Sequence, residues 1–133
     1  MAHALYHGDS QNDAIKIYQQ VFDTFDENDG ERYINAADTL AKALKGKEAL
    51  PIRRKIVEFY EKNNDDENLC SELLTLISTL SGEEYLGEKA ERFRQYAALC
   101  KKLGEKISYY ELEDFTGTLK ELGHDEEAEE FLQ

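Results

Sequence analysis

The chain has 133 residues, of which 41% are hydrophobic and 34% are charged, and its formal net charge is −13. This composition fits one domain with a hydrophobic core and excludes an intrinsically disordered chain. No apolar run reaches the ~18 residues of a membrane span. The excess of acidic residues argues against binding nucleic acid through its phosphates and favours basic partners.

The N-terminal residues MAHALYHGDS lack the charged segment and apolar stretch of a signal peptide. We therefore predict a cytoplasmic protein with a single domain over residues 1–133, of which residues 1–8 are frayed.

Hydrophobic residues recur at helical spacing along almost the whole chain, and no strand-like alternation persists. In the first segment, Ala14, Tyr18, Val21 and Phe22 fall on one face of a helix. Pro51 suits the first turn of a later helix, where its missing N–H costs nothing. The pattern predicts an all-α fold of about six to seven helices. We expect them near residues 10–25, 31–45, 50–63, 67–80, 84–103, 107–122 and 124–132.

The predicted helices show a period of 38 residues, which is marked by four anchor positions: Ala14, Ile52, Ala90 and Ala128. A glycine precedes each anchor by a few residues: Gly8, Gly46, Gly82 and Gly123. Glycine suits a turn after a helix, because it adopts left-handed backbone angles at little cost. The period predicts repeated antiparallel α-hairpins. The alternative is chance, since any helical bundle has helices of similar length.

Residues 25–34, FDENDGERYI, have the acidic character of a calcium-binding loop. With Asp26 in the first position, Asn28 fits the third, but Gly30 in the fifth offers no side-chain oxygen. Glu31 stands where the loop needs glycine, and Ala37 stands where it needs a bidentate glutamate. We therefore interpret this segment as a turn between two helices.

The segment FTGTLKELGHDEEAEEFLQ resembles the junction of a tetratricopeptide repeat, where Leu-Gly ends one helix and paired acids precede an alanine in the next. HGDSQNDAIKIYQQVF is similar, with Ala14 and Tyr18 in the alanine and aromatic positions. The chain departs from that family in its period, which is 38 rather than about 34 residues, and in its lack of tryptophan. It also lacks a proline at the end of each unit, and Ile52 replaces a small alanine. The resemblance implies a right-handed stack of α-hairpins that binds a peptide or partner helix in its concave groove without catalysing a reaction.

A basic residue stands two places after each of the first three anchors: Lys16, Arg54 and Arg92. These cations could form a row that holds an acidic peptide or a terminal carboxylate. The alternative is that they form salt bridges with acids on neighbouring helices.

Several of the eight tyrosines are further candidates for a binding groove, since tyrosine is enriched at interfaces. The candidates are Tyr33, Tyr60, Tyr96, Tyr109 and Tyr110. The alternative is that most of them fill gaps between helices while their hydroxyls reach water. Gly117 interrupts a helical pattern, and we interpret it as a site of close helix approach, with a binding role as the alternative.

Other residues with reactive or ligating side chains give weaker signals. Cys70 and Cys100 are expected to be small buried hydrophobes, with a disulfide or reactive thiol as the alternative. His3 and His7 are spaced i, i+4, which could chelate a metal on a helix, but they lie at the chain end. We predict no catalytic residues, cofactor or metal.

The sequence therefore favours a non-enzymatic protein-interaction module or adaptor, which binds a peptide or partner protein in a helical groove. The alternative is an acidic inhibitor or immunity-type protein that neutralises a basic partner. A homodimer is a further possibility, because incomplete end units can pack on a second copy. Neither nucleic acid nor membrane is an expected partner.

Overall fold

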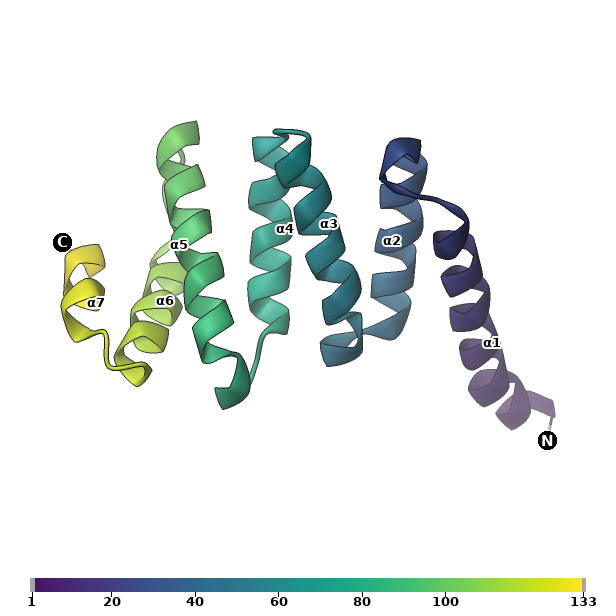
Figure 1. Ribbon diagram of the computed structural model, residues 1–133. Coiled ribbons are helices and arrows are strands. Elements are labelled where there is room, and N and C mark those ends of the chain that lie inside the picture. The colour runs from purple at the N-terminus through teal and green to yellow at the C-terminus, as the bar shows by residue number, and fades with distance from the viewer. Residues whose placement is uncertain (1, 133) are drawn as a thin grey trace. The chain divides into compact units, whose positions relative to one another are not determined.

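A computed structural model describes the backbone of residues 2–132 and the side chains of residues 11–132 (Figure 1). The described chain consists of seven α-helices and three short 3-10 helices, and it contains no β-strand. The prediction of an all-α fold is therefore confirmed. Within this part of the chain, no helix combines the length and the apolar character needed to cross a membrane. The helices form two compact units, Met1–Asn63 and Asn64–Gln133, which are described separately.

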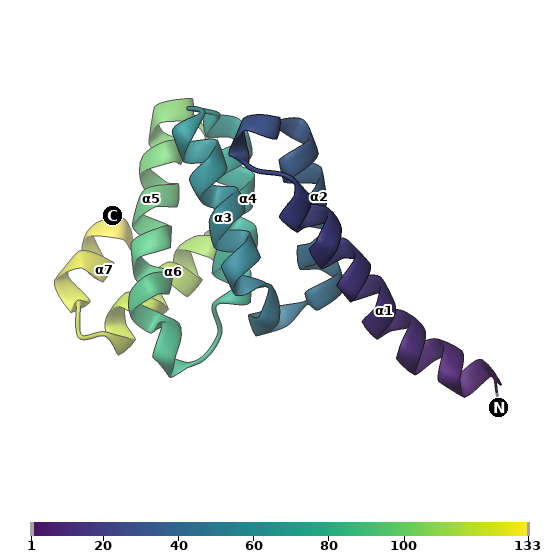
Figure 2. The ribbon, with the colours of Figure 1, turned by 45° about the vertical axis from the view of Figure 1, so that its right-hand side comes forward.

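The first unit contains three α-helices and two 3-10 turns. They are α1 (Ala2–Thr24), η1 (Glu27–Asp29), α2 (Glu31–Leu44), η2 (Gly46–Ala49) and α3 (Leu50–Lys62). Helix α2 packs against both α1 and α3. Helix α1 begins at Ala2, well before the start predicted near residue 10, so Gly8 lies inside a helix and not in a turn. Figure 2 shows the N-terminal part of α1 running beyond the end of α2. The side chains of His3 and His7 lie outside the described part of the structure.

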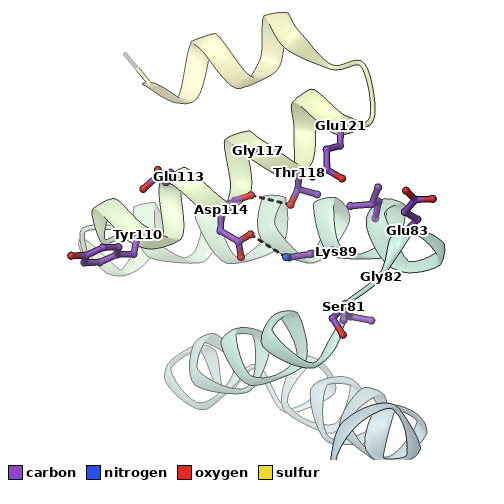
Figure 3. A pocket seen from close by; sticks show the side chains of 12 residues that line it. Ser81, Gly82, Glu83, Lys89, Tyr110, Glu113, Asp114, Gly117, Thr118 and Glu121 are labelled. Carbon is purple, nitrogen blue, oxygen red and sulfur yellow. Dashed lines mark hydrogen bonds and ion pairs between the residues drawn. The ribbon is translucent and has the colours of Figure 1, made fainter.

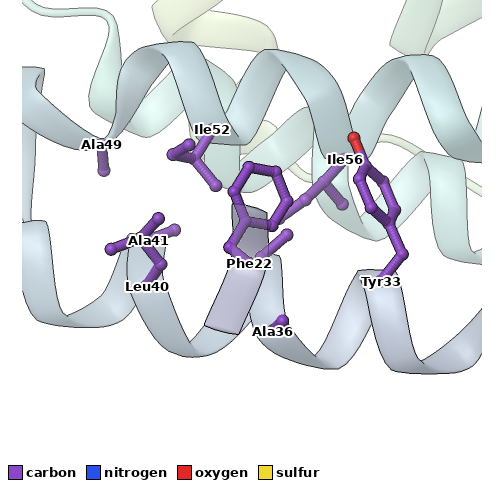
Figure 4. Close-up of a cluster of buried hydrophobic side chains, with 9 residues drawn as sticks. Phe22, Tyr33, Ala36, Leu40, Ala41, Ala49, Ile52 and Ile56 are labelled. Atoms are coloured by element: carbon purple, nitrogen blue, oxygen red, sulfur yellow. The ribbon is translucent and has the colours of Figure 1, made fainter. Parts of the chain in front are cut away.

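The core of the first unit is a row of small and aliphatic side chains from α2 and α3, with Phe22 near its middle and Tyr33 at one end (Figure 4). Leu40 is fully buried, and Ala37 and Ala41 on the same face of α2 allow the neighbouring helices to come close. The ring of Tyr33 lies between Phe22 of α1 and Phe59 of α3, with centroid distances of 5.2 Å and 5.7 Å. Of the stripe read from the sequence on α1, Phe22 is buried and Tyr18 packs partly against this core, whereas Val21 is 44% exposed.

The acidic segment at residues 26–30 is a turn between α1 and α2, as predicted. The Asp26 carboxylate accepts a hydrogen bond from the Asn28 N–H at 2.8 Å, and the Asp29 carboxylate accepts one from the Asp26 N–H at 2.8 Å. This reciprocal capping box satisfies backbone donors that a short helix leaves open. Two acidic side chains of this turn therefore accept hydrogen bonds from its own backbone.

The second unit contains four α-helices and one 3-10 turn. They are α4 (Asp66–Thr79), η3 (Glu83–Tyr85), α5 (Leu86–Leu103), α6 (Tyr109–Glu121) and α7 (Asp125–Leu132). Helix α5 packs against α4 and against α6, and α6 also packs against α7. The turns before α5 and before α7 contain Gly82 and Gly123, whose φ angles of 109° and 82° are accessible to glycine but costly for other residues. Both glycines stand where the sequence predicts a turn.

Aromatic rings connect the last three helices of the second unit. Phe93 of α5 stacks on Phe115 of α6 at a centroid distance of 4.9 Å, and Phe115 meets the edge of Phe131 of α7 at 4.5 Å. Phe115 is 1% exposed. Burying one such side chain stabilises a fold by roughly 1.5–3 kcal/mol, so this row is a main source of cohesion between α5, α6 and α7.

A partly exposed ion pair joins α5 to α7. Arg94 donates two hydrogen bonds to the Glu127 carboxylate, from Nε at 2.8 Å and from Nη2 at 2.9 Å. His124 Nδ1 lies 3.5 Å from the same carboxylate and adds attraction only when the ring is protonated. The bonds from Arg94 favour the ionised acid, so they lower the pKa of Glu127 from its ordinary value. In the unfolded chain, Glu127 has its ordinary pKa of about 4.3.

The lowered pKa of Glu127 predicts how its contribution to stability depends on pH. Because the folded state holds a proton on this group less tightly than the unfolded state, the contribution is complete above pH ~4.3 and is lost as pH falls through the lower folded value. We expect Glu127→Gln to reduce the free energy of unfolding at pH 7 by about 0.5–1 kcal/mol, a small value because both side chains remain about one-third exposed. The difference from the unmodified protein should shrink as pH falls from 5 to 3. Urea denaturation at several pH values measures it.

Glu129→Gln is the matched control, because Glu129 is an exposed residue of the same helix. It should change stability by less than about 0.5 kcal/mol at every pH. A loss in Glu127→Gln that is independent of pH would contradict the electrostatic explanation.

Candidate functional site

The strongest candidate site is a groove in the second unit, which we call the α6 groove. It has a volume of ≈ 580 Å³ and is formed by the end of α4, the turn at residues 81–83, helix α5 and one face of α6 (Figure 3). Its apolar lining comes from Leu80 and Leu86. Tyr110 lies at one end of the groove in Figure 3, and Glu83 and Glu121 lie at the other end.

One face of α6 supplies most of the polar lining of the groove. Tyr110, Glu113, Asp114, Gly117 and Glu121 are spaced i, i+3, i+4, i+7 and i+11, which places them along one side of a helix. The start of that helix is set by a capping box between Ser108 and Glu111: the Glu111 N–H donates to the Ser108 hydroxyl at 3.2 Å, and the Ser108 N–H donates to the Glu111 carboxylate at 3.4 Å. The Tyr96 hydroxyl of α5 also donates to Glu111, at 2.8 Å. Local capping and one contact to α5 thus set which side chains face the groove.

The groove carries a negative charge. Lys89 of α5 is the only cation among the residues that line it, and its Nζ lies 3.1 Å from the Asp114 carboxylate. Within the described residues, Glu83, Glu113 and Glu121 have no cationic partner. One cation therefore stands against four carboxylates, and such a surface attracts basic groups.

Two exposed tyrosines lie at the start of α6. Tyr109 is 72% exposed and Tyr110 is 82% exposed, and their rings meet edge to face at 6.2 Å. An exposed tyrosine ring can hold a Lys or Arg side chain over its face, which contributes about 0.5–1 kcal/mol at an exposed site. Tyr110 is thus the one predicted binding residue that lines the α6 groove.

The other predicted tyrosines have different environments. Tyr33 and Tyr96 are each 5% exposed, so they fill space between helices, as the alternative interpretation of the tyrosines has it. Burial, the Cys100 thiol and the Glu111 carboxylate raise the pKa of Tyr96, so its hydroxyl stays neutral and donates to Glu111. Tyr60 is half-buried on α3, and Tyr109 lies next to the groove.

The predicted cations do not gather at the groove. Lys16 is exposed on α1 and Arg54 is half-buried on α3, both in the first unit, whereas Arg92 lies on α5 in the second. Arg92 Nη1 donates to Gln95 Oε1 at 3.1 Å, and Arg54 also has an interaction partner. The row of cations across three helices stays a prediction.

The sequence prediction did not include the acids of α6, although their helical spacing can be read from the sequence.

Gly117 does not mark a close helix approach, contrary to the prediction. A Cβ atom added at this residue would meet no atom within 4 Å outside its own helical surroundings. Gly117 instead lines the α6 groove, where the missing side chain keeps the middle of the groove open. The binding role that the sequence left as the alternative stays a prediction.

A second hollow, of ≈ 440 Å³, lies on the first unit between α1 and α2. Its lining includes Ile17, Tyr18, Val21 and Phe25, and Ile17 and Val21 are 56% and 44% exposed. Exposed apolar clusters of this kind are typical of contact surfaces. This hollow offers apolar area, but it has few polar or charged groups that would distinguish one kind of partner from another.

Comparison of the chain with protein-family models, with curated proteins and with solved structures finds no match. The candidate site therefore rests on its own geometry and charge.

The open space at Gly117 gives a prediction of stability. Gly117→Ala should raise the free energy of unfolding by about 0.5–1 kcal/mol, because alanine favours the helix and its methyl group meets no neighbour. Gly123→Ala is the matched control: its φ of 82° strains any residue with a Cβ, so it should lower stability by about 1 kcal/mol or more. Chemical denaturation measures both variants. A destabilised Gly117→Ala would show that this face of α6 is packed and not open.

Proposed function

We propose that this protein is a non-enzymatic interaction module whose α6 groove binds a short basic segment of a partner protein. The observation that carries the proposal is the charge of the groove, where Lys89 is already paired with Asp114 and Glu83, Glu113 and Glu121 have no cationic partner in the described residues. A Lys or Arg side chain that enters the groove would supply the missing positive charge.

The groove also offers contacts that do not depend on charge. Leu86 is half-buried and provides apolar surface, and Tyr110 provides an exposed ring at one end. Exposed charge pairs contribute mainly to orientation and to the association rate, so apolar area must supply much of the affinity. A basic segment with one or two apolar residues beside its cations fits this combination.

The size of the groove favours a segment over a whole protein face. A volume of ≈ 580 Å³ accommodates a few side chains. The alternative function, an acidic inhibitor that covers a basic partner, draws on the same chemistry but would use the charge of the entire surface, −13. The two functions differ in one measurable respect: whether removing acids of the groove weakens binding more than removing acids elsewhere on the surface.

We further propose that the helices form tetratricopeptide-like hairpins with a 38-residue repeat. The anchors Ile52, Ala90 and Ala128 lie on α3, α5 and α7, the second helices of pairs that close at Gly46, Gly82 and Gly123, and all three anchors are buried. Equivalent burial at equal spacing is what a structural repeat requires. Ala14 is half-buried on α1 and fits the series less closely.

The test is a titration of the protein with a short peptide that contains Arg, Lys and one Trp. Because the chain has no tryptophan, the fluorescence of the peptide reports binding directly. We expect binding that weakens as salt rises from 50 to 300 mM, and no binding of a peptide in which Glu replaces the basic residues. Removing two groove charges, with Glu113→Gln and Glu121→Gln together, should weaken binding about 3- to 10-fold.

The double variant Glu129→Gln and Glu130→Gln is the matched control. It removes the same charge from exposed positions on α7, outside the residues that line the α6 groove. This variant should bind within about 2-fold of the unmodified protein. Equal weakening in both double variants would favour the inhibitor with a diffuse acidic surface, and no binding of the basic peptide would refute the proposal.

A further inference from the structure

Two buried thiols face each other across the contact between α4 and α5. Cys70 of α4 and Cys100 of α5 are 6% and 1% exposed, both are free, and their Sγ atoms lie 4.0 Å apart. The prediction that both cysteines are buried is confirmed, and neither forms the disulfide that was the alternative.

A carboxylate completes the cluster. The Sγ atoms of Cys70 and Cys100 and a carboxylate oxygen of Glu105 all lie within 4.8 Å of one another. The end of α5 positions Glu105 next to the two sulfur atoms. Gly104 adopts left-handed backbone angles with φ of 72°, and the Glu105 N–H donates a hydrogen bond to the Cys100 carbonyl at 2.8 Å. This is the usual way in which a helix end is capped by glycine. Glu105 itself is exposed, so the cluster has one side open to solvent.

From this cluster we propose that Cys70, Cys100 and Glu105 bind a thiophilic divalent metal ion of the zinc type. Zinc binds thiolate sulfur at about 2.3 Å in a tetrahedral arrangement, which places two sulfur ligands about 3.8 Å apart. The observed separation of 4.0 Å matches this spacing without rearrangement of α4 or α5. A disulfide would instead need the sulfurs to approach to about 2.05 Å.

An ion bound here changes the protonation of its sulfur ligands. Burial, and next the neighbouring Cys100, raise the pKa of Cys70 to about 12, so without an ion the Cys70 thiol is neutral. Coordination by a divalent cation deprotonates a thiol outright. Binding therefore forms two metal–sulfur bonds and one metal–oxygen bond, releases two protons to solvent and changes no oxidation state. Two thiolates and one carboxylate then surround the 2+ charge, and the fourth coordination position is left to water or to a partner's side chain.

Two neighbouring contacts hold the helices around the cluster in place. Tyr96 lies one turn before Cys100 on α5, and its hydroxyl donates to Glu111. Lys102 of α5 pairs with Asp66 of α4 at 2.7 Å, which holds the two helices that carry the cysteines.

The test uses the purified, reduced protein with Zn²⁺, and with Co²⁺ as a spectroscopic probe. We expect one ion per chain, a thiolate-to-cobalt charge-transfer absorption and a melting temperature that rises with added Zn²⁺. Cys70→Ser and Cys100→Ser should each abolish the absorption. Because these positions are buried and the variants could be destabilised, Glu105→Gln at the exposed ligand is the decisive change, and it should weaken Zn²⁺ binding at least about 10-fold.

Glu67→Gln is the matched control, because Glu67 is an exposed acid in the first turn of α4 and lies outside the cluster. It should leave Zn²⁺ affinity within about 2-fold. The proposal is overturned by equal binding in Glu105→Gln and the unmodified protein, or by cobalt binding without a thiolate band. It is also overturned if the pair oxidises to a disulfide in air while binding no ion, which a mass loss of two hydrogens would reveal.

Discussion

The second unit depends on the burial of helix α5 on two sides at once. Its buried residues Ala90, Phe93, Tyr96, Leu99 and Cys100 do not lie on one narrow stripe, and α5 packs against both α4 and α6. Because protein interiors are packed as densely as organic crystals, a helix held on two sides can neither rotate nor slide without loss of contact. The α6 groove, the thiol pair and the Arg94–Glu127 ion pair all include side chains from this helix, so its placement fixes their geometry.

This placement also separates two kinds of charge. Where α5 faces its neighbours it supplies cations that are paired: Lys89 with Asp114, Arg94 with Glu127 and Lys102 with Asp66. The surplus acids therefore stay at the surface of the unit, and some of them gather along α6 at Glu113 and Glu121. Paired charges hold the helices together, whereas the unpaired acids of the described groove are available to a ligand. The net charge of −13 is therefore unevenly distributed over the surface, and composition alone does not show where the acidic residues gather.

Sequence periodicity predicted the helices well and the site poorly, for one physical reason. A 3.6-residue pattern shows which residues of a helix share a face, and it placed Phe22 on a face that is buried. The 38-residue period placed the turn glycines Gly82 and Gly123. It does not show which helix meets which face, so it could not predict that Cys70 meets Cys100, or that Gly117 opens a groove. Tyr33 and Tyr96 illustrate the same limit, because a tyrosine in a helical stripe suits a core and a binding surface equally well until its neighbours are known.

We propose that the acids of the α6 groove, and not the net charge of the chain, select the partner. The most direct measurement follows the backbone amide resonances of ¹⁵N-labelled protein during titration with the basic, Trp-containing peptide. If the peptide binds in the α6 groove, shift changes concentrate at residues 110–121 of α6, at the turn around Gly82 and at Lys89. Small changes spread over the acidic surface, or changes centred on Ile17 and Val21 of the α1–α2 hollow, would contradict it.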